Sequence, residues 1–189
     1  MSRLLQLRDA IVAQIQAAIE GADVAGHLGR FSEDELRKFM IASAASGCGV
    51  RVAMLGLANP VKVSDEGVDY EAIVGIYVVT RDGAGRLSRD EASIAAVETI
   101  MILCDRTRWG LPFCKIGERP PSAQNLYNAK ALADGMALWA IDLRQPVRLA
   151  PPAAAEGGAL SALWLGISPN IGTNHAADYV QVAPEPAGE

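Results

Sequence analysis

The pattern of hydrophobic positions is clearest between Val68 and Trp109, where a strand-like run precedes a glycine-containing break and an amphipathic helix. Residues 72–79 are apolar at nearly every position and rich in Val and Ile, so periodicity does not select one buried face. Such a run predicts an interior strand that is covered on both sides. We therefore expect the chain to be organised around this strand.

A helix is predicted to begin at Ser88. Gly83 and Gly85 allow the chain to turn, and Ser88 with Glu91 has the spacing of a capping box. Apolar residues then follow at helical spacing: Ile94, Val97, Met101 and Cys104, widened by Ile100 and Leu103. We expect this stripe to lie on the sheet, and we expect Gly110 and Pro112 to end the helix.

Two further helices are predicted nearer the N-terminus. Residues 2–20 place Leu4, Leu7, Ile11, Ile15 and Ala18 at helical spacing, and Gly21 follows as a stop. A shorter helix is expected over 32–43, where Ser32 and Glu35 form a second capping box. The glycine-spaced stretch between them, 21–31, is interpreted as a connector, so His27 is expected to be a surface-loop histidine.

The hydrophobic pattern predicts the remaining strands less clearly. A strand over 49–58 should stop at Asn59–Pro60 and pair antiparallel with 68–81 through a long acidic hairpin loop. Residues 111–116 could form a brief strand, and 117–130 are interpreted as loop because prolines and turn formers interrupt any period. Strand character returns over 136–149, with Pro146 expected to close the strand. The pattern predicts an α+β fold, with an antiparallel or mixed sheet of about four strands flanked by helices.

The chain is expected to divide after its first 149 residues. Residues 1–149 form the predicted compact domain, 150–159 an Ala/Pro/Gly linker, 160–183 a C-terminal segment or arm with short strands, and 184–189 a disordered tail. Apolar side chains beyond a linker must be buried, either on their own domain or on the sheet edge of a neighbouring copy. The candidate interaction residues are Trp164, Leu165, Tyr179 and Val180.

Composition narrows the possible partners. Half of the residues are hydrophobic but only 5% are aromatic, so Ala, Val, Leu and Ile must fill the core. The formal net charge is −5 and the 17 basic residues are scattered, which argues against a nucleic-acid-binding surface. No apolar run approaches the roughly 20 residues of a membrane span, and we expect a soluble, non-secreted protein that binds no membrane.

Sequence motifs for catalysis or cofactor binding are absent. The chain has no dinucleotide-binding glycine pattern, phosphate-binding loop, nucleophile elbow or zinc-protease motif. Cys48, Cys104 and Cys114 lack metal-ligand spacing and are expected to be buried thiols. We therefore predict no catalytic residue, no cofactor and no metal site.

The sequence contains three weaker candidates for chemistry. The turn from Asp82 to Ser88 joins a strand to a helix N-terminus, the geometry that binds phosphate, but it lacks a lysine. His175 lies near Asp178, without a nucleophile fixed beside it. The carboxylates of Asp65, Glu66 and Asp69 are interpreted as a solvated loop tip, with nothing basic nearby to separate their pKa values.

The order of these segments resembles a known family. The helix LRDAIVAQIQAAI, the segment FSEDELRKFM, the strands GVRVAMLGL and VVTRD, the helix leading to WGLP, and ALWAIDLRQP follow one another as in Mu-like phage and prophage tail-region proteins. The likeness covers about 4–149, and the C-terminal SPNIGTN and DYVQV also resemble the endings of these proteins. These proteins are of the tail-completion or tail-terminator type.

The resemblance implies a tail-terminator-like fold and a structural, non-enzymatic role. It implies a homo-oligomeric ring, usually a hexamer, at the head–tail junction of a virion made in the bacterial cytoplasm. Its partners would be tail tube, sheath or head-completion proteins. Two alternatives stay open: a small-molecule-binding or enzymatic α+β domain that uses the Asp82–Ser88 turn, and a regulatory module with a host partner.

Overall fold

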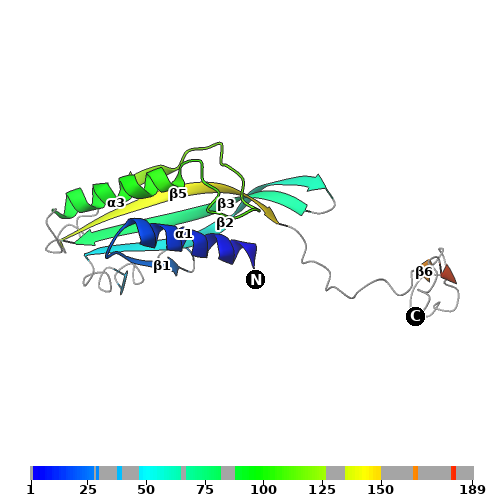
Figure 1. Ribbon diagram of the computed structural model, residues 1–189, viewed down its shortest axis with the longest axis horizontal. Coiled ribbons are helices and arrows are strands. Elements are labelled where there is room, and N and C mark those ends of the chain that lie inside the picture. The colour runs from blue at the N-terminus through cyan, green and yellow to red at the C-terminus, as the bar shows by residue number, and fades with distance from the viewer. Residues whose placement is uncertain are drawn as a thin grey trace. The chain divides into compact units, whose positions relative to one another are not determined.

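The computed structural model describes residues 2–27, 29, 38–39, 47–64, 67–81, 88–126, 135–149, 164–165 and 180–181. The chain forms two compact units, Met1–Leu149 and Ala150–Glu189 (Figure 1). The first contains α1 (Arg3–Ala18), β1 (Asp23–His27), β2 (Cys48–Ser64), β3 (Gly67–Arg81), α3 (Arg89–Cys104), β4 (Ser122–Asn125) and β5 (Met136–Leu149). The second contains β6 (Trp164–Leu165) and β7 (Val180–Gln181), which pair antiparallel.

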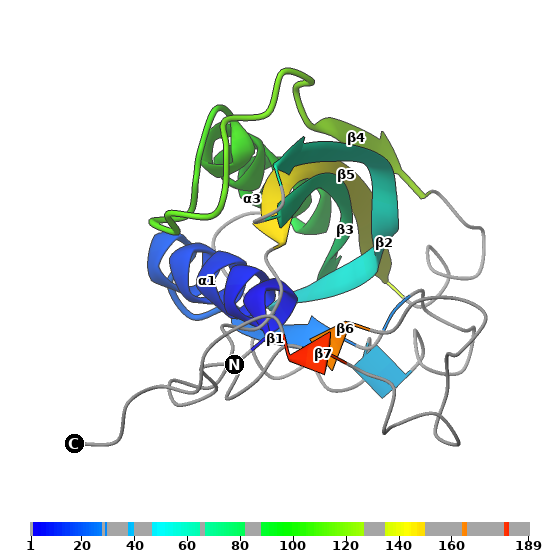
Figure 2. The ribbon, with the colours of Figure 1, turned by 90° about the vertical axis from the view of Figure 1, so that its right-hand side faces the viewer.

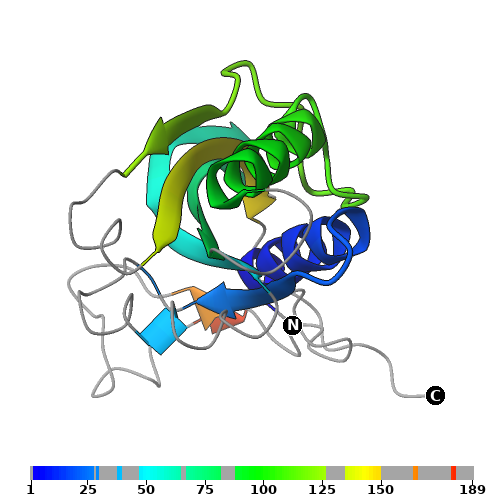
Figure 3. The same cartoon turned by 90° about the vertical axis from the view of Figure 1, so that its left-hand side faces the viewer.

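The first unit is built on a five-stranded mixed sheet in the order β1-β2-β3-β5-β4. β1 is parallel to β2, and the other neighbours are antiparallel. β3 is the central strand: Ile76 lies opposite Val52 of β2 and Ile141 of β5. The sheet is strongly curved, and α1 and α3 lie on the same side of it (Figures 2 and 3). The predicted α+β class is confirmed, with five strands in this sheet rather than about four.

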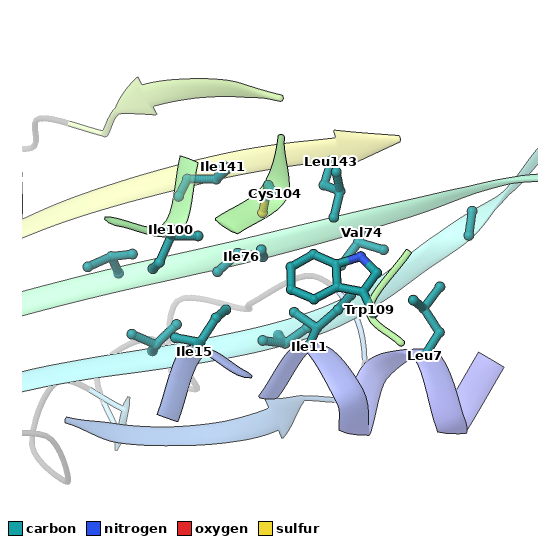
Figure 4. Packing of buried hydrophobic residues seen from close by; sticks show 14 of the residues in the cluster. Leu7, Ile11, Ile15, Val74, Ile76, Ile100, Cys104, Trp109, Ile141 and Leu143 are labelled. Atoms are coloured by element: carbon teal, nitrogen blue, oxygen red, sulfur yellow. The ribbon is translucent and has the colours of Figure 1, made fainter. Parts of the chain in front are cut away.

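The main core lies between the two helices and the sheet (Figure 4). α1 contributes Leu7, Ile11 and Ile15, all fully buried, as its predicted stripe requires. β3 contributes alternate residues from Ala72 to Val78, and Trp109 fills the space beyond the C-terminus of α3. Each large aliphatic side chain buried here stabilises the fold by roughly 1.5–3 kcal/mol, so burial fixes the positions of the helices.

The predicted start of α3 is confirmed, but its predicted buried face is partly wrong. The Ser88 hydroxyl accepts from the Glu91 amide, and the Glu91 carboxylate accepts from the Ser88 amide. The face on the sheet consists of small and medium side chains, while Ile94 is 56% exposed. These buried residues are Ser93, Ala96, Val97, Ile100 and Cys104. The helix ends at Cys104, before the predicted stop, and Gly110 (φ +72°) belongs to the turn that follows.

The predicted connector after α1 is wrong in part, because Asp23–His27 is a strand. β1 pairs in parallel with β2 over Gly49–Ala53, and the Arg51 guanidinium holds its start by donating to the Asp23 carbonyl at 2.8 Å and to its carboxylate at 2.5 Å. His27 therefore lies on a strand rather than in a surface loop. Gly21, with φ +76°, ends the α1 turn as predicted.

β2 does not stop at Asn59–Pro60. It continues to Ser64, and register shifts accommodate the irregular positions around Asn59, whose φ is +51°. Strand pairing with β3 resumes at Val61. Ser64 pairs with Gly67, so most of the predicted long hairpin loop belongs to the two strands, and Asp69 lies on β3.

The edge of β5 is also more ordered than predicted. Residues 122–125, expected in a loop, form β4 and pair with β5 from Trp139 to Asp142. The brief strand expected over 111–116 is reduced to a single bridge between Cys114 and Val147. Pro146 does not close β5, which pairs with β3 as far as Leu149.

The face of β3 opposite the helices is covered at one end. There Phe39, Val79 and Leu138 form a small second cluster. Lys38 and Phe39 are the described part of the predicted helix over 32–43, and both are helical; the rest of that prediction lies outside the described residues, as do the linker 150–159 and the tail 184–189. At the other end of β3 this face carries Asp69 and Glu71 instead.

Candidate interaction surface

One end of the β2–β3 hairpin forms an arm, which we define as Gly56–Ser64 of β2 with Gly67–Glu71 of β3. It extends past the ends of both helices (Figure 1). Among the described residues, β1 covers β2 only over Gly49–Ala53, so the outer edge of the arm has no strand beside it. Three large apolar side chains are exposed on it: Leu57 by 40%, Val61 by 59% and Val63 by 47%.

The arm is poorly suited to pairing through its backbone. Its register with β3 shifts three times, between Met54 and Gly56, Ala58 and Val61, and Lys62 and Ser64. Bulges and Pro60, which has no amide hydrogen, interrupt the regular row of donors and acceptors that an added strand needs. The arm therefore offers side chains rather than an open backbone edge.

The root of the arm is held by ion pairs on the sheet face opposite the helices. The Asp69 carboxylate accepts from Arg148 of β5 at 2.8 Å and also from the Lys115 ammonium. These hydrogen bonds hold the pKa of Asp69 down at about 2. Beside it, the Asn59 amide donates to the Glu71 carboxylate at 2.8 Å, and Arg144 lies 3.6 Å from the same carboxylate.

These ion pairs correct the sequence-based interpretation of the acidic residues. Asp69 was expected at a solvated tip with nothing basic nearby, yet it lies opposite Arg148 in the β3–β5 register. The sequence allows this pairing to be predicted, because antiparallel pairing of the strands over 68–81 and 136–149 places the first residues of one strand beside the last residues of the other. Asp65 and Glu66 lie outside the described residues.

The predicted interaction residues of the C-terminal segment fall in the second compact unit. Trp164 and Leu165 form β6, and Val180 begins β7. Leu165 lies opposite Val180 and Trp164 lies opposite Gln181. The strands expected within 160–183 are thus present at these residues, while Tyr179 and His175 lie outside the described part of the chain.

Of the Asp82–Ser88 turn, only Ser88 is described. Its amide and hydroxyl both donate to the Glu91 carboxylate, at 2.9 and 2.8 Å. The Ser88 amide also lowers the pKa of Glu91. The Glu91 carboxylate therefore already accepts from the Ser88 amide at the start of the helix, which is the kind of amide that binds phosphate in other proteins.

The cysteines are unsuited to chemistry at neutral pH. Cys104 and Cys114 are buried and Cys48 is half-buried, with no disulfide among them. Burial raises the pKa of Cys104 to about 12 and the pKa values of Cys48 and Cys114 to about 11. Thiols held neutral in this way are weak nucleophiles and poor metal ligands. Within the described ranges, no cluster of His, Cys, Asp and Glu side chains could hold a metal ion.

A small hollow lies at the edge of β5, beside the C-terminal end of α3. Its volume of about 140 Å³ is below the roughly 300–1,000 Å³ of typical small-molecule sites. Basic and acidic side chains line it together: Arg106, Arg119, Arg144, Asp105 and Glu118. The mixed charges and the negative end of the α3 dipole give it no clear preference for a charged ligand.

No protein-family model matches the chain, and a search of curated proteins found no significant match. Among the described residues, no helix is both long and apolar enough to cross a membrane.

Proposed function

We propose that the protein is a structural component of a phage or prophage virion that acts in tail completion or termination at the head–tail junction. It works without catalysis, by self-assembly into a ring, which we expect to be a hexamer. The observation that carries the proposal is the arm, which exposes Leu57, Val61 and Val63 to solvent at the projecting end of the β2–β3 hairpin.

Exposed apolar side chains gathered on one projecting element are typical of association surfaces. Apolar area buried against a partner stabilises a complex by roughly 25 cal/mol per Å², before the entropy of association is subtracted. The ion pairs of Asp69 at the root of the arm hold it in place before association, which lowers the entropy lost on binding.

The fold and the charge agree with this role. An α+β unit whose helices pack on a sheet is the kind of domain that the resemblance to Mu-like tail-region proteins implies. A ring through which DNA passes should not hold the DNA, and the net charge of −5 disfavours tight contact with phosphate.

Size-exclusion chromatography with light scattering, followed by electron microscopy, tests the assembly. We expect the full-length protein to form rings of about six copies, as closed cyclic oligomers do. A strictly monomeric protein at high concentration would refute self-assembly. Mass spectrometry of particles from the host tests the virion role, and a protein that forms rings but is absent from purified particles would refute that part of the proposal.

A further inference from the structure

The segment between α3 and β4, residues 105–121, is a basic part of an acidic chain. It contains four basic and two acidic residues, a net charge of +2, whereas the whole chain has a net charge of −5. Lys115 pairs with Asp69. The other basic side chains of the segment are exposed and form no ion pair within the described residues: Arg106, Arg108 and Arg119. The α3–β4 segment therefore offers unpaired positive charge to a partner.

The hairpin that forms the arm has the opposite charge. Residues 56–71 include four acidic residues and one basic residue, a net charge of −3. Two of the acidic residues, Asp69 and Glu71, form the ion pairs at the root of the arm. The other two, Asp65 and Glu66, follow the exposed valines of the arm in the sequence. The arm is therefore both apolar and acidic.

The projecting end of the arm does not reach these arginines of its own chain. Arg106 and Arg119 line the small hollow together with Arg144 of β5, and Arg144 lies opposite Ile73 of β3. Six strand residues lie between Ile73 and Gly67 at the end of the hairpin, a distance of about 20 Å. The hairpin is paired along this length and extends past the helices (Figure 1). Contact between the end of the arm and these arginines therefore requires a second copy.

We propose that the projecting end of the arm docks on the α3–β4 segment of the next copy, with the arm's carboxylates beside Arg106 and Arg119. The inference rests on the proposed self-assembly and names the surfaces that carry it. Each copy has one arm and one segment, so the contacts run head to tail and close into a ring when the rotation between copies allows it.

Charge and exposed apolar area both favour this contact. Opposite net charges on the arm and the segment attract, while the acidic outer face of α3, with Glu91 and Glu98, repels the arm and disfavours docking there. Val63 of the arm is 47% exposed and Ile116 of the segment is 48% exposed. Burying such side chains adds to the stability of the contact.

Charge reversal tests the proposal in the full-length protein. Asp65→Lys with Glu66→Lys makes the arm positive, and Arg106→Glu with Arg119→Glu makes the segment negative. Each double variant alone should associate at least tenfold more weakly than the wild type and elute as a monomer in light scattering. Mixed in equal amounts, the two should form rings again, because the reversed arm meets the reversed segment and the natural arm meets the natural segment.

The mixture also controls for folding, because rings return only if both variants are folded. Glu20→Lys with Glu98→Lys is the matched control: it makes the same change in net charge at exposed positions outside both surfaces, and it should leave the ring intact. Ring loss in this control as well would overturn the assignment to the arm and the segment.

Salt provides a second test. The Debye length falls from about 10 Å at 0.1 M to about 3 Å at 1 M, so a contact selected by exposed charges should weaken at least tenfold over this range. Association of equal strength at both salt concentrations would overturn the proposed contact.

The outcomes separate this inference from the proposed function. Rings that survive both double variants would overturn the contact between arm and segment while self-assembly stands. Variants that lose the ring and do not recover it when mixed would also overturn the contact. A wild-type protein that stays monomeric would overturn both the contact and the proposed self-assembly.

Discussion

The indole Nε1–H of Trp109 donates a 2.9 Å hydrogen bond to Oε1 of Gln145, and both side chains are buried. The Gln145 amide in turn donates to the Lys115 carbonyl at 2.5 Å. The Gln145 side chain of β5 thereby links the turn that contains Trp109 to the segment around Lys115, which runs along the edge of the sheet. A glutamine on the buried face of a strand is explained by these two partners.

Replacing this glutamine should destabilise the first unit. Gln145→Leu leaves the Trp109 N–H and the Lys115 carbonyl without their partner, and the buried, unsatisfied Trp109 N–H alone costs about 1–3 kcal/mol. Urea unfolding should show the loss. Trp109→Phe in the same chain removes the stranded donor, so the double variant should lose less than the sum of the single changes; strict additivity would contradict the coupling.

The pH dependence of stability should report on Asp69. Its pKa of about 2 in the folded protein lies below the usual value near 3.9, so its ion pairs contribute stability that is fully present above about pH 4 and is lost as the pH falls through about 2. Thermal unfolding between pH 2 and 5 should show a shallower decline for Asp69→Asn. Lys115→Met and Arg148→Met should each give an intermediate profile, and a profile unchanged by all three would contradict the assignment.

A charge in the centre of β3 should prevent folding. Ile76 is fully buried between β2 and β5, and an unpaired buried charge costs several kcal/mol against a total stability of roughly 5–15 kcal/mol. Ile76→Asp should be insoluble or unfolded by circular dichroism. Ile94→Asp, at an exposed isoleucine of α3, should fold normally. A native-like Ile76→Asp protein would contradict the burial of this strand.

The capping box of α3 should contribute measurable stability. Ser88→Ala removes the hydroxyl that accepts from the Glu91 amide and should cost about 1 kcal/mol in urea unfolding. Ser88→Gly is the comparison, because glycine at this position costs only a few tenths of a kcal/mol relative to serine. Equal stability of the alanine variant and the wild type would show that the cap is unimportant.

Removing Ala150–Glu189 should leave the first unit folded. The main core cluster is made of residues between Leu7 and Val147, and the deleted unit has its own strand pair. We expect an unchanged melting transition but weaker self-association in light scattering, because the segment carries Trp164, Leu165 and Val180. An oligomer of unchanged size would restrict the segment to a role within its own chain.

The sequence predicted the elements whose patterns are local. α1 follows from its apolar spacing, the start of α3 from Ser88 and Glu91, and β3 from its apolar run. The buried face of α3 was harder to choose, because isoleucines occur on several sides of it. The sheet accepts the side with Ser93 and Ala96, where small side chains let the helix approach closely, and leaves Ile94 and Ile102 outside.

The elements that were missed depend on partners distant in the sequence. β1 (DVAGH) and β4 (SAQN) are short and barely apolar, and they are strands because β2 and β5 offer them a backbone edge. Asn59–Pro60 resembled a stop because a bulge uses the same residues as a turn. The sequence also does not reveal the candidate surface, because the residues between Pro60 and Val68 are expected in a hairpin loop, where Val61 and Val63 have no predicted position.

The central position of β3 has a consequence during synthesis. β2 and β3 are adjacent in the sequence and can pair as soon as both have left the ribosome, but β5, which covers the other edge of β3, is made only after α3 and β4. In that interval the apolar run from Ala72 to Val79 has an open backbone edge, which is a template for joining other nascent chains. The time between the synthesis of Arg81 and that of Leu149 is therefore when this chain is most vulnerable to aggregation.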